Sequence, residues 1–250
     1  MTSPSSQTVL ITGATGDFGK AFAARFIARG DHVILHGRSA DKLAALQQEL
    51  DGNTSTLCFD VTDADAVAKA MKGLPAIDVL INNAGGALGL DKAQDADLAD
   101  WETMVEMNVL GLLRVTNPIL KTMAERKKGL IINIGSIAGT YPYPGGHVYC
   151  ATKAFVRQFS LAMRADLSGT HIRVTNIEPG MVETQFSLMR FKGDSEKAAS
   201  VYANTTPLTA DDIAETVFWV ASLPPHVNIN ALEIMPTVQS FGPLPVERHG

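Results

Sequence analysis

Residues 8–19 have the sequence TVLITGATGDFG, in which a short apolar run leads into a turn containing three glycines. Thr8–Ile11 has the composition of a buried strand, and the segment from Phe18 onward has the apolar period of a helix. Such a turn lets backbone N–H groups approach a pyrophosphate at the positive end of the helix dipole. Glycines at a strand-to-helix turn also serve tight packing where no ligand binds. Because this is the first such turn in the chain, we favour phosphate binding by Gly13, Thr15, Gly16, Asp17 and Phe18.

The glycine spacing departs from the common pattern TGxxxGxG, which would place a glycine at position 17. Here Asp17 occupies that position and the middle glycine is Gly16. A carboxylate beside a pyrophosphate repels it. We therefore expect the Asp17 side chain to turn away and to cap the first helix.

Beyond this turn, short β-branched apolar runs alternate with longer segments of helical period. This alternation predicts an α/β fold: a single Rossmann-type, doubly wound parallel sheet of about seven strands with helices on both faces. The predicted strands are Thr8–Ile11, His32–His36, Ser55–Phe59, Val79–Asn82, Leu130–Ile134, Arg173–Ile177 and Ala231–Met235. The predicted helices are Phe18–Arg29, Asp41–Leu50, Asp63–Lys72, Asp100–Lys127, Val148–Leu167 and Ala210–Ser222.

The chain has 250 residues, of which 46% are apolar and 19% charged. This length and composition suit one α/β domain over residues 1–250, and the sequence contains no repeat or interdomain linker. Residues 179–207 have weak periodicity and mixed charge, which favours an insertion over the sheet edge. Long loops of this kind often close over active sites, so we expect a substrate lid at about residues 180–208.

The charge balance and the cysteines exclude several classes of function. A net charge of −5 and a pI near 5.7 argue against nucleic acid binding, which requires a basic face. Residues 1–10 lack the features of a secretion signal, and no run reaches the roughly 18 apolar residues of a membrane span. Cys58 and Cys150 cannot form a disulfide framework and have no metal-ligand spacing. A cytoplasmic protein that acts on small molecules is expected.

The predicted second strand ends in His36-Gly37-Arg38-Ser39, without the acidic residue that holds the free 2′-hydroxyl of NAD. This favours NADP(H), because Arg38 can pair with the 2′-phosphate and Ser39 can donate a hydroxyl. Alternatively, Arg38 is an ordinary surface arginine. The third and fourth strands end at Asp60-Val61 and at Asn82–Gly85. We expect Asp60, Val61 and Asn83 to lie at the same cofactor edge.

Tyr149 and Lys153 are four residues apart in a predicted helix, so they share one face. A nearby ammonium and an oxidised nicotinamide both favour the phenolate, which fits Tyr149 for proton transfer near neutral pH. Ser136 follows a strand, where its hydroxyl can hold a substrate oxygen. Asn108 is either a satisfied core amide or part of a functional hydrogen-bond chain. Each residue alone has a structural explanation, but the combination favours an active site.

Together these motifs resemble those of the short-chain dehydrogenase/reductase family, and the resemblance covers nearly the whole chain. It implies that Tyr149 is the acid or base, and that Lys153 lowers its pKa and binds the nicotinamide ribose. It also implies that Ser136 orients the substrate and that Asn108 supports a proton-relay water. The segment around Pro179-Gly180 belongs to the same resemblance, which places further cofactor contacts at Pro179, Gly180, Val182 and Thr184.

Within this family, segments such as ATKAFVRQFS (151–160) and RFKGD (190–194) resemble bacterial NADP-dependent 3-hydroxy acid dehydrogenases. Those enzymes oxidise serine or allo-threonine, or reduce malonic semialdehyde. Arg190 can bind a carboxylate, and Tyr143 and Gln239 can add neutral donors. Arg190 can instead anchor the lid by a surface salt bridge.

Two alternatives stay open. ETQF (183–186) also resembles sulfoacetaldehyde reductases, which form isethionate and for which Arg190 would bind a sulfonate. A protein that binds NADP without turnover is a second alternative, and Asp17 is the argument for it. The resemblance further implies a homotetramer.

Overall fold

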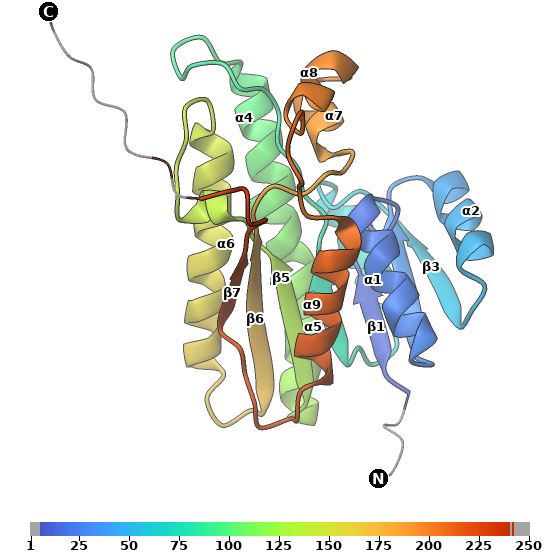
Figure 1. Cartoon of the computed structure of the whole chain (residues 1–250). Coiled ribbons are helices and arrows are strands. Elements are labelled where there is room, and N and C mark those ends of the chain that lie inside the picture. Colours follow the sequence, from blue (N-terminus) through green and yellow to red (C-terminus); the bar gives the residue numbers. More distant parts are fainter. Residues whose placement is uncertain (1–5, 241, 243–250) are drawn as a thin grey trace, which may run out of the picture.

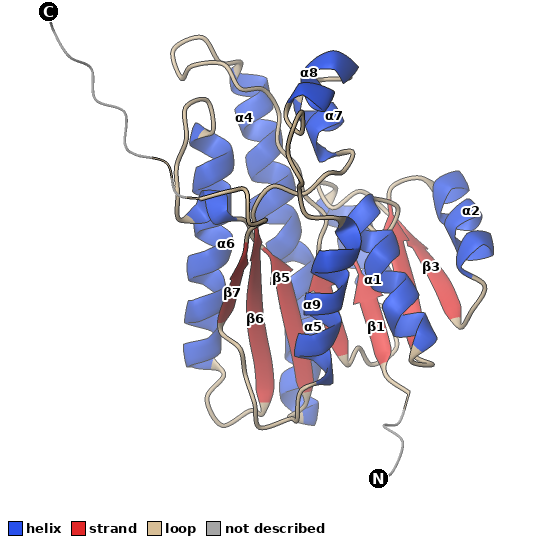
Figure 2. Cartoon of the chain, in the orientation of Figure 1, coloured by secondary structure: helices blue, strands red, loops and turns tan. Residues whose placement is uncertain are grey.

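A computed structural model of the protein describes residues 6–240 and residue 242. Seven parallel strands form one sheet in the order β3-β2-β1-β4-β5-β6-β7 (Figures 1 and 2). The strands are β1 (Thr8–Ile11), β2 (His32–Gly37), β3 (Thr54–Cys58), β4 (Val79–Asn82), β5 (Gly129–Ile134), β6 (Ile172–Pro179) and β7 (Ala231–Ile234).

The strand order reverses direction between β1 and β4. On one side of β1 lie β2 and then β3. On its other side β1 pairs with β4, which is followed by β5, β6 and β7. All carboxyl ends lie at one edge, because every strand pair is parallel. Ligands of open α/β sheets bind at this edge, where the crossovers diverge.

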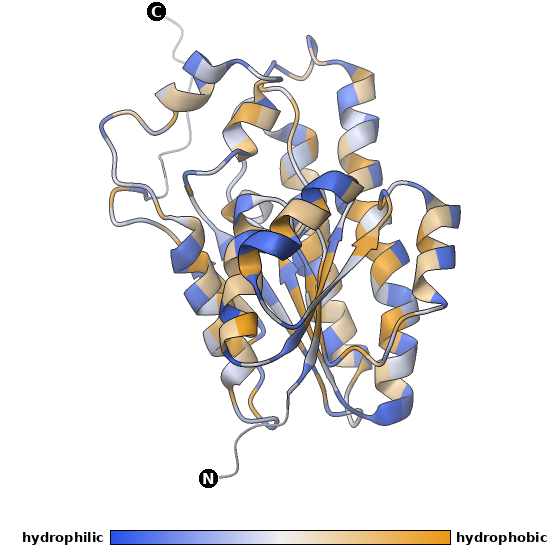
Figure 3. Ribbon diagram, turned by 90° about the vertical axis from the view of Figure 1, so that its right-hand side faces the viewer, coloured by the Kyte–Doolittle hydropathy of each residue, from blue (hydrophilic) through white to orange (hydrophobic). Residues whose placement is uncertain are grey.

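Helices cover both faces of the sheet (Figure 1). One face packs against α1 (Asp17–Ala28), α2 (Ala40–Leu50) and α9 (Ala210–Ser222), whose buried side chains include Phe22 and Phe26. The other face packs against α3 (Ala64–Met71), α5 (Gly111–Arg126) and α6 (His147–Asp166). Figure 3 shows strands that are largely hydrophobic between helices that alternate hydrophobic and hydrophilic residues along their length. Within residues 6–240, no helix has the length and apolar character needed to cross a membrane.

The predicted fold class is confirmed, and each predicted strand is observed with its ends shifted by no more than two residues. The predicted helix Asp100–Lys127 is divided in the structure into α4 (Leu98–Val105), a π-helical turn (Glu106–Leu110) and α5. Two short helices in the predicted lid were not expected, α7 (Phe186–Arg190) and α8 (Ser195–Ser200). These helices have only five and six residues, which is too short to show a helical period in the sequence.

A buried chain of polar side chains joins the elements beneath the active edge. The Asn82 amide donates to Thr116 Oγ1 and to Asn133 Oδ1, both at 2.8 Å. The Asn133 amide donates in turn to Ser160 Oγ at 2.8 Å. All four side chains are buried. The chain of hydrogen bonds thus ties β4 and β5 to α5 and α6, the helix that carries Tyr149 and Lys153.

Asn133→Ala is expected to lower the free energy of unfolding by about 2 kcal/mol, because the buried Asn82 amide loses one of its two acceptors and the buried Ser160 hydroxyl loses its donor. Urea denaturation measures the change. Asn53→Ala at an exposed position is the matched control, expected to stay within about 0.5 kcal/mol of the unchanged protein. Equal effects of the two substitutions would show that the buried chain of amides contributes nothing particular to stability.

Candidate active site

A cavity of about 530 Å³ opens at the carboxyl edge of the sheet. Its wall combines the first glycine-rich turn, the ends of β2 to β5, the first half of α6 and the start of the predicted lid. Twelve of the residues predicted from the sequence line it: Gly13, Thr15, Gly16, Asp17, Phe18, Arg38, Asp60, Val61, Asn83, Tyr149, Lys153 and Thr184. The wall also contains apolar residues that the sequence did not single out, among them Met107, Phe186 and Met189.

The glycine-rich turn is held in place by the end of β4. Thr12 Oγ1 accepts from the backbone N–H groups of Asn83 and Ala84, each at 2.9 Å. The Asn83 amide donates to the carbonyls of Thr12 and Gly13. Gly13 has φ +65°, and a Cβ there would lie 3.1 Å from the Ala84 backbone. The turn therefore requires glycine at this point, and it leaves the start of α1 facing the cavity.

The expected capping role of Asp17 is wrong. Gly16 is the N-cap residue of α1, and no side chain caps this helix. Asp17 Oδ2 instead accepts from the backbone N–H of Gln185 at 2.6 Å. The carboxylate therefore turns toward the predicted lid, and the first N–H groups of α1 keep no side-chain acceptor of their own.

His36 supports the same turn and was missed by the sequence reasoning. Its Nδ1 accepts from the Gly13 N–H at 3.3 Å, which leaves Nε2 to donate to the Phe59 carbonyl at 3.1 Å. The ring also packs on Phe59, with centroids 4.0 Å apart. Burial lowers the pKa of His36 from 6.5 to about 4. The neutral imidazole is thus a fixed link between β1, β2 and β3.

The residues predicted around the cofactor phosphate have separate roles. Arg38 is exposed at the cavity wall. Ser39 Oγ accepts from the Lys42 N–H at 3.4 Å and caps α2, and it lies outside the wall. Hydrogen bonding by the Thr62 backbone, with a smaller contribution from Arg38, lowers the pKa of Asp60.

Tyr149 and Lys153 lie on the first two turns of α6, and both are buried. Lys153 Nζ donates to the Ile134 carbonyl at 2.8 Å and lies 5.8 Å from the centre of the Tyr149 ring. Burial lowers the pKa of Lys153 to about 8. Burial also raises the pKa of Tyr149 to about 12, while the Ser136 hydroxyl and the Arg190 guanidinium lower it. The expected lowering of the Tyr149 pKa is thus outweighed by burial, which the sequence reasoning did not weigh.

Arg190, at the end of α7, lies among three aromatic rings. Its guanidinium carbon is 4.8 Å from the ring centre of Phe186, 5.0 Å from that of Tyr149 and 5.6 Å from that of Tyr143. Nη2 donates to the Tyr143 hydroxyl at 2.6 Å. The buried Nε has no acceptor in the described part of the chain. A cation above the Tyr149 ring that keeps a free N–H is suited to an anion.

The other predicted residues surround the cavity without lining it. Asn108 lies in the π-helical turn and exchanges two hydrogen bonds with the Gly86 backbone, and its amide also reaches Thr152 of α6. Ser136 Oγ accepts from the Ala138 N–H at 3.1 Å. Gln239 Oε1 accepts from the Met181 N–H at 2.7 Å. Pro179 ends β6, Gly180 donates its N–H to Ile234, and Val182 pairs with Leu208.

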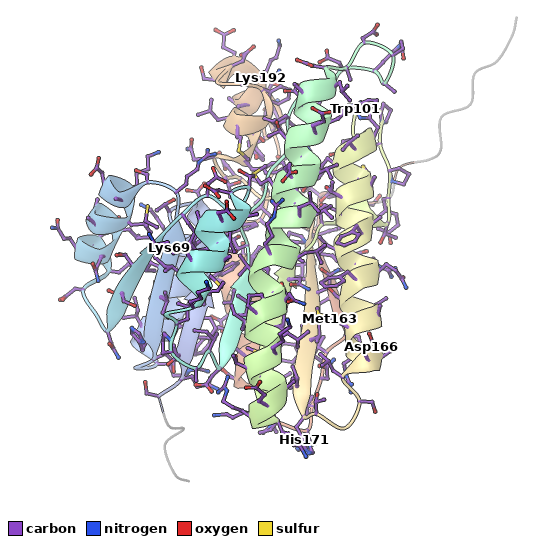
Figure 4. The ribbon with its side chains drawn as sticks, turned by 180° about the vertical axis from the view of Figure 1, so that it is seen from behind. Lys69, Trp101, Met163, Asp166, His171 and Lys192 are labelled. Carbon is purple, nitrogen blue, oxygen red and sulfur yellow. The ribbon has the colours of Figure 1, made fainter. Side chains whose placement is uncertain are left out.

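The predicted lid is tied to α4 and to the loop before it. The Gly89 N–H donates to the Arg190 carbonyl at 2.9 Å, and Lys192 Nζ pairs with Asp100 at 2.8 Å. Figure 4 shows Lys192 at the same end of the molecule as Trp101 of α4. These contacts hold the C-terminal end of α7.

The sequence and the fold are similar to those of known dehydrogenases. Residues 7–194 match the family described as short chain dehydrogenase. The chain is 56% identical to the NADP-dependent 3-hydroxy acid dehydrogenase YdfG of Salmonella typhi, over 96% of this chain and 99% of that protein. It is 53% identical to the serine 3-dehydrogenase of Rhizobium radiobacter, over 97% and 99% of the two chains.

Two solved structures are similar over most of their length. The closed form of serine dehydrogenase complexed with NADP⁺ has a TM-score of 0.95 at 51% identity, covering 97% of this chain and 100% of that one. Serine dehydrogenase from Escherichia coli has a TM-score of 0.82 at 46% identity, covering 94% and 100%.

The free energy of unfolding is expected to fall as the pH is lowered from 7.5 to 5, and His36→Gln is expected to abolish the part of this fall that comes from His36. The folded pKa of His36 is about 4, below its ordinary value of 6.5, so only the unfolded chain takes up the proton as the pH falls through this window. This uptake lowers the free energy of unfolding by about 2 kcal/mol, and glutamine cannot titrate. Urea denaturation of both proteins at the two pH values measures the difference. The same loss in both proteins would contradict the assignment of a buried neutral imidazole.

Proposed function

The chain belongs to the short-chain dehydrogenase family, and on that premise we propose that it is an NADP(H)-dependent dehydrogenase of small 3-hydroxy acids such as serine. It interconverts the hydroxy acid and the corresponding oxo acid or semialdehyde. The observation that carries this proposal is the position of the Arg190 guanidinium 5.0 Å above the ring of Tyr149. A proton-transfer group that lines the cavity and a candidate receptor for a carboxylate therefore lie side by side.

The cavity residues fit NADP(H). The start of α1 has no side-chain cap, so its N–H groups and dipole can receive the pyrophosphate. Arg38, exposed at the wall where β2 ends, is suited to the 2′-phosphate, and no acidic residue stands at that point to hold a free hydroxyl. When bound, the cofactor supplies the hydride exchange. Asn83 and Thr184 line the same wall and complete its polar side.

Tyr149 carries the proton to and from the substrate oxygen. Its buried phenol has a raised pKa of about 12, so it is protonated at neutral pH and ready to donate to a carbonyl oxygen. For oxidation of an alcohol, the cations near the ring must stabilise the phenolate, and Lys153 and Arg190 are both within 6 Å of the ring centre, at 5.8 Å and 5.0 Å. Ser136 shares the substrate oxygen with Tyr149.

The substrate anion pairs with Arg190. The guanidinium is fixed by the three rings and by Tyr143, so little conformational entropy is lost when an anion binds. Its free Nε adds a charge-assisted hydrogen bond in a largely desolvated place. In this arrangement Tyr143 orients the arginine. The side-chain oxygen of Gln239 accepts from the Met181 N–H at the base of the lid, and its side-chain N–H groups stay the proposed donors to the anion.

The family resemblance also supports a homotetramer and a lid over residues 180–208. The lid proposal rests on α7, whose residue Phe186 lines the cavity while Arg190 faces Tyr149. The two ends of the segment pair with each other through an isolated bridge between Val182 and Leu208.

Tyr149→Phe is expected to reduce kcat for oxidation of a 3-hydroxy acid about a thousandfold, because it removes the oxygen that transfers the proton. The dissociation constant of NADPH, followed by its fluorescence, should change less than about threefold, since the ring and its packing remain. Retained turnover in this variant would contradict the assigned role of Tyr149.

Arg190→Met is expected to lower kcat/KM for 3-hydroxypropanoate about a hundredfold, the effect of losing one desolvated charged hydrogen bond. Values for 1-propanol, which has no carboxylate, should fall about tenfold less, because this alcohol loses only the stabilisation of the Tyr149 phenolate. Lys197→Met is the matched control, since it removes an exposed lid cation that pairs with Asp194. Equal losses for both alcohols, or an equal effect of the control, would argue that Arg190 does not bind the anion.

A further inference from the structure

Asp17 joins two parts of the chain that are 168 residues apart in sequence. Its Oδ2 accepts from the backbone N–H of Gln185 at 2.6 Å, the short distance expected of a hydrogen bond to a charged acceptor. Both residues line the same cavity, Asp17 from the first turn of α1 and Gln185 from the start of the lid. The contact therefore spans the mouth of the cofactor cleft.

Gln185 is the N-cap residue of α7, the helix that ends at Arg190. A short helix of this kind has no side-chain cap of its own, and it needs external acceptors for its first N–H groups. The Asp17 carboxylate satisfies one of them. Its negative charge also lies at the positive end of α7.

The two ends of α7 are held by different partners. At the C-terminal end, the Arg190 carbonyl accepts from Gly89, and Lys192 pairs with Asp100. At the N-terminal end, Phe186 N–H reaches Thr184 Oγ1 at 3.3 Å within the lid itself. Asp17 is the partner from outside the lid at this end, because it belongs to α1. The Phe186 ring also packs on Tyr149 of α6, with centroids 5.6 Å apart, so Asp17 adds a directed hydrogen bond to this apolar contact.

We propose that Asp17 is a positioning residue, whose bond to Gln185 fixes the start of α7 over the cleft and thereby sets the place of Arg190. The effect on substrate rests on the function proposed above, whereas the effect on the lid does not. A glycine at position 17, as in the common form of the turn, has no side chain that can make this bond. The carboxylate is compatible with an anionic cofactor because it faces the lid and leaves the first N–H groups of α1 free.

Amide hydrogen exchange of the protein without cofactor tests the lid effect directly. In Asp17→Gly, exchange of the peptide that contains Gln185 is expected to rise about tenfold, the effect of losing a charge-assisted hydrogen bond. Asp17→Asn keeps an oxygen acceptor without the charge and should lie between glycine and the unchanged protein. Asp41→Gly, in the first turn of α2, is the matched control and should leave this peptide unchanged. Unchanged exchange in Asp17→Gly would overturn the proposal.

Gln185→Pro provides a second, reciprocal variant, because it deletes the N–H donor, and Gln185→Ala, which keeps that N–H, controls for the loss of the glutamine side chain. Gln185 has φ −63°, which proline adopts without strain. If the two groups act through their mutual bond, adding Asp17→Gly to this variant should cause no further rise in exchange. Additive effects would contradict the pairing. Should the proline variant fail to fold, the comparison of glycine with asparagine at position 17 still decides the question.

Kinetics then connect the lid to the substrate. Asp17→Gly should raise KM for 3-hydroxypropanoate about tenfold while KM for 1-propanol stays within about threefold, because only the hydroxy acid has a carboxylate that pairs with Arg190. An unchanged KM together with increased exchange would refute the link to Arg190. If the unchanged protein fails to oxidise any 3-hydroxy acid, the proposed function fails, and the exchange experiment still tests the lid.

Discussion

The contact between the Arg190 guanidinium and the Tyr149 ring is the interaction on which this account depends. The arginine comes from the lid and the tyrosine from α6, and Tyr143 and Phe186 complete the enclosure of the cation. A cation at this place serves two purposes. It offers a hydrogen bond to a substrate anion, and it moderates the raised pKa that burial gives to Tyr149. In the proposed function, proton transfer and recognition of the anion are therefore coupled through one side chain.

The rest of the fold places the two residues. Parallel strands bring the ends of β1, β4 and β5 to one edge, where the crossovers diverge. Buried amides of Asn82 and Asn133 hold α6 to that edge, and Asn108 links the same helix to the loop at Gly86. These hydrogen bonds are buried, and each joins a polar group to a partner, so they fix the position of α6 more firmly than apolar packing alone.

Much of this arrangement was predictable from the sequence because it depends on local patterns. Apolar runs and helical periods identified all seven strands and both faces of the sheet. The pair Tyr149 and Lys153 followed from helical spacing. The predictions that were wrong or missing concern contacts between segments that are distant in the sequence. Asp17 was expected to cap its own helix and instead serves Gln185, and His36 was missed because a histidine in an apolar strand gives no signal of its partners. Burial raises the pKa of Tyr149 in the protein without cofactor, which spacing does not show, and a phenolate favoured by an oxidised nicotinamide stays a prediction.

We propose that Arg190 selects a hydroxy acid by the charge of its carboxylate, beside Tyr149, which transfers the proton. The most direct measurement compares kcat/KM for 3-hydroxypropanoate and 1-propanol in the unchanged protein with NADP⁺, following NADPH formation. We expect kcat/KM to be about a hundredfold higher for the hydroxy acid, which is the contribution of one desolvated charged pair. Equal values for the two alcohols would contradict it.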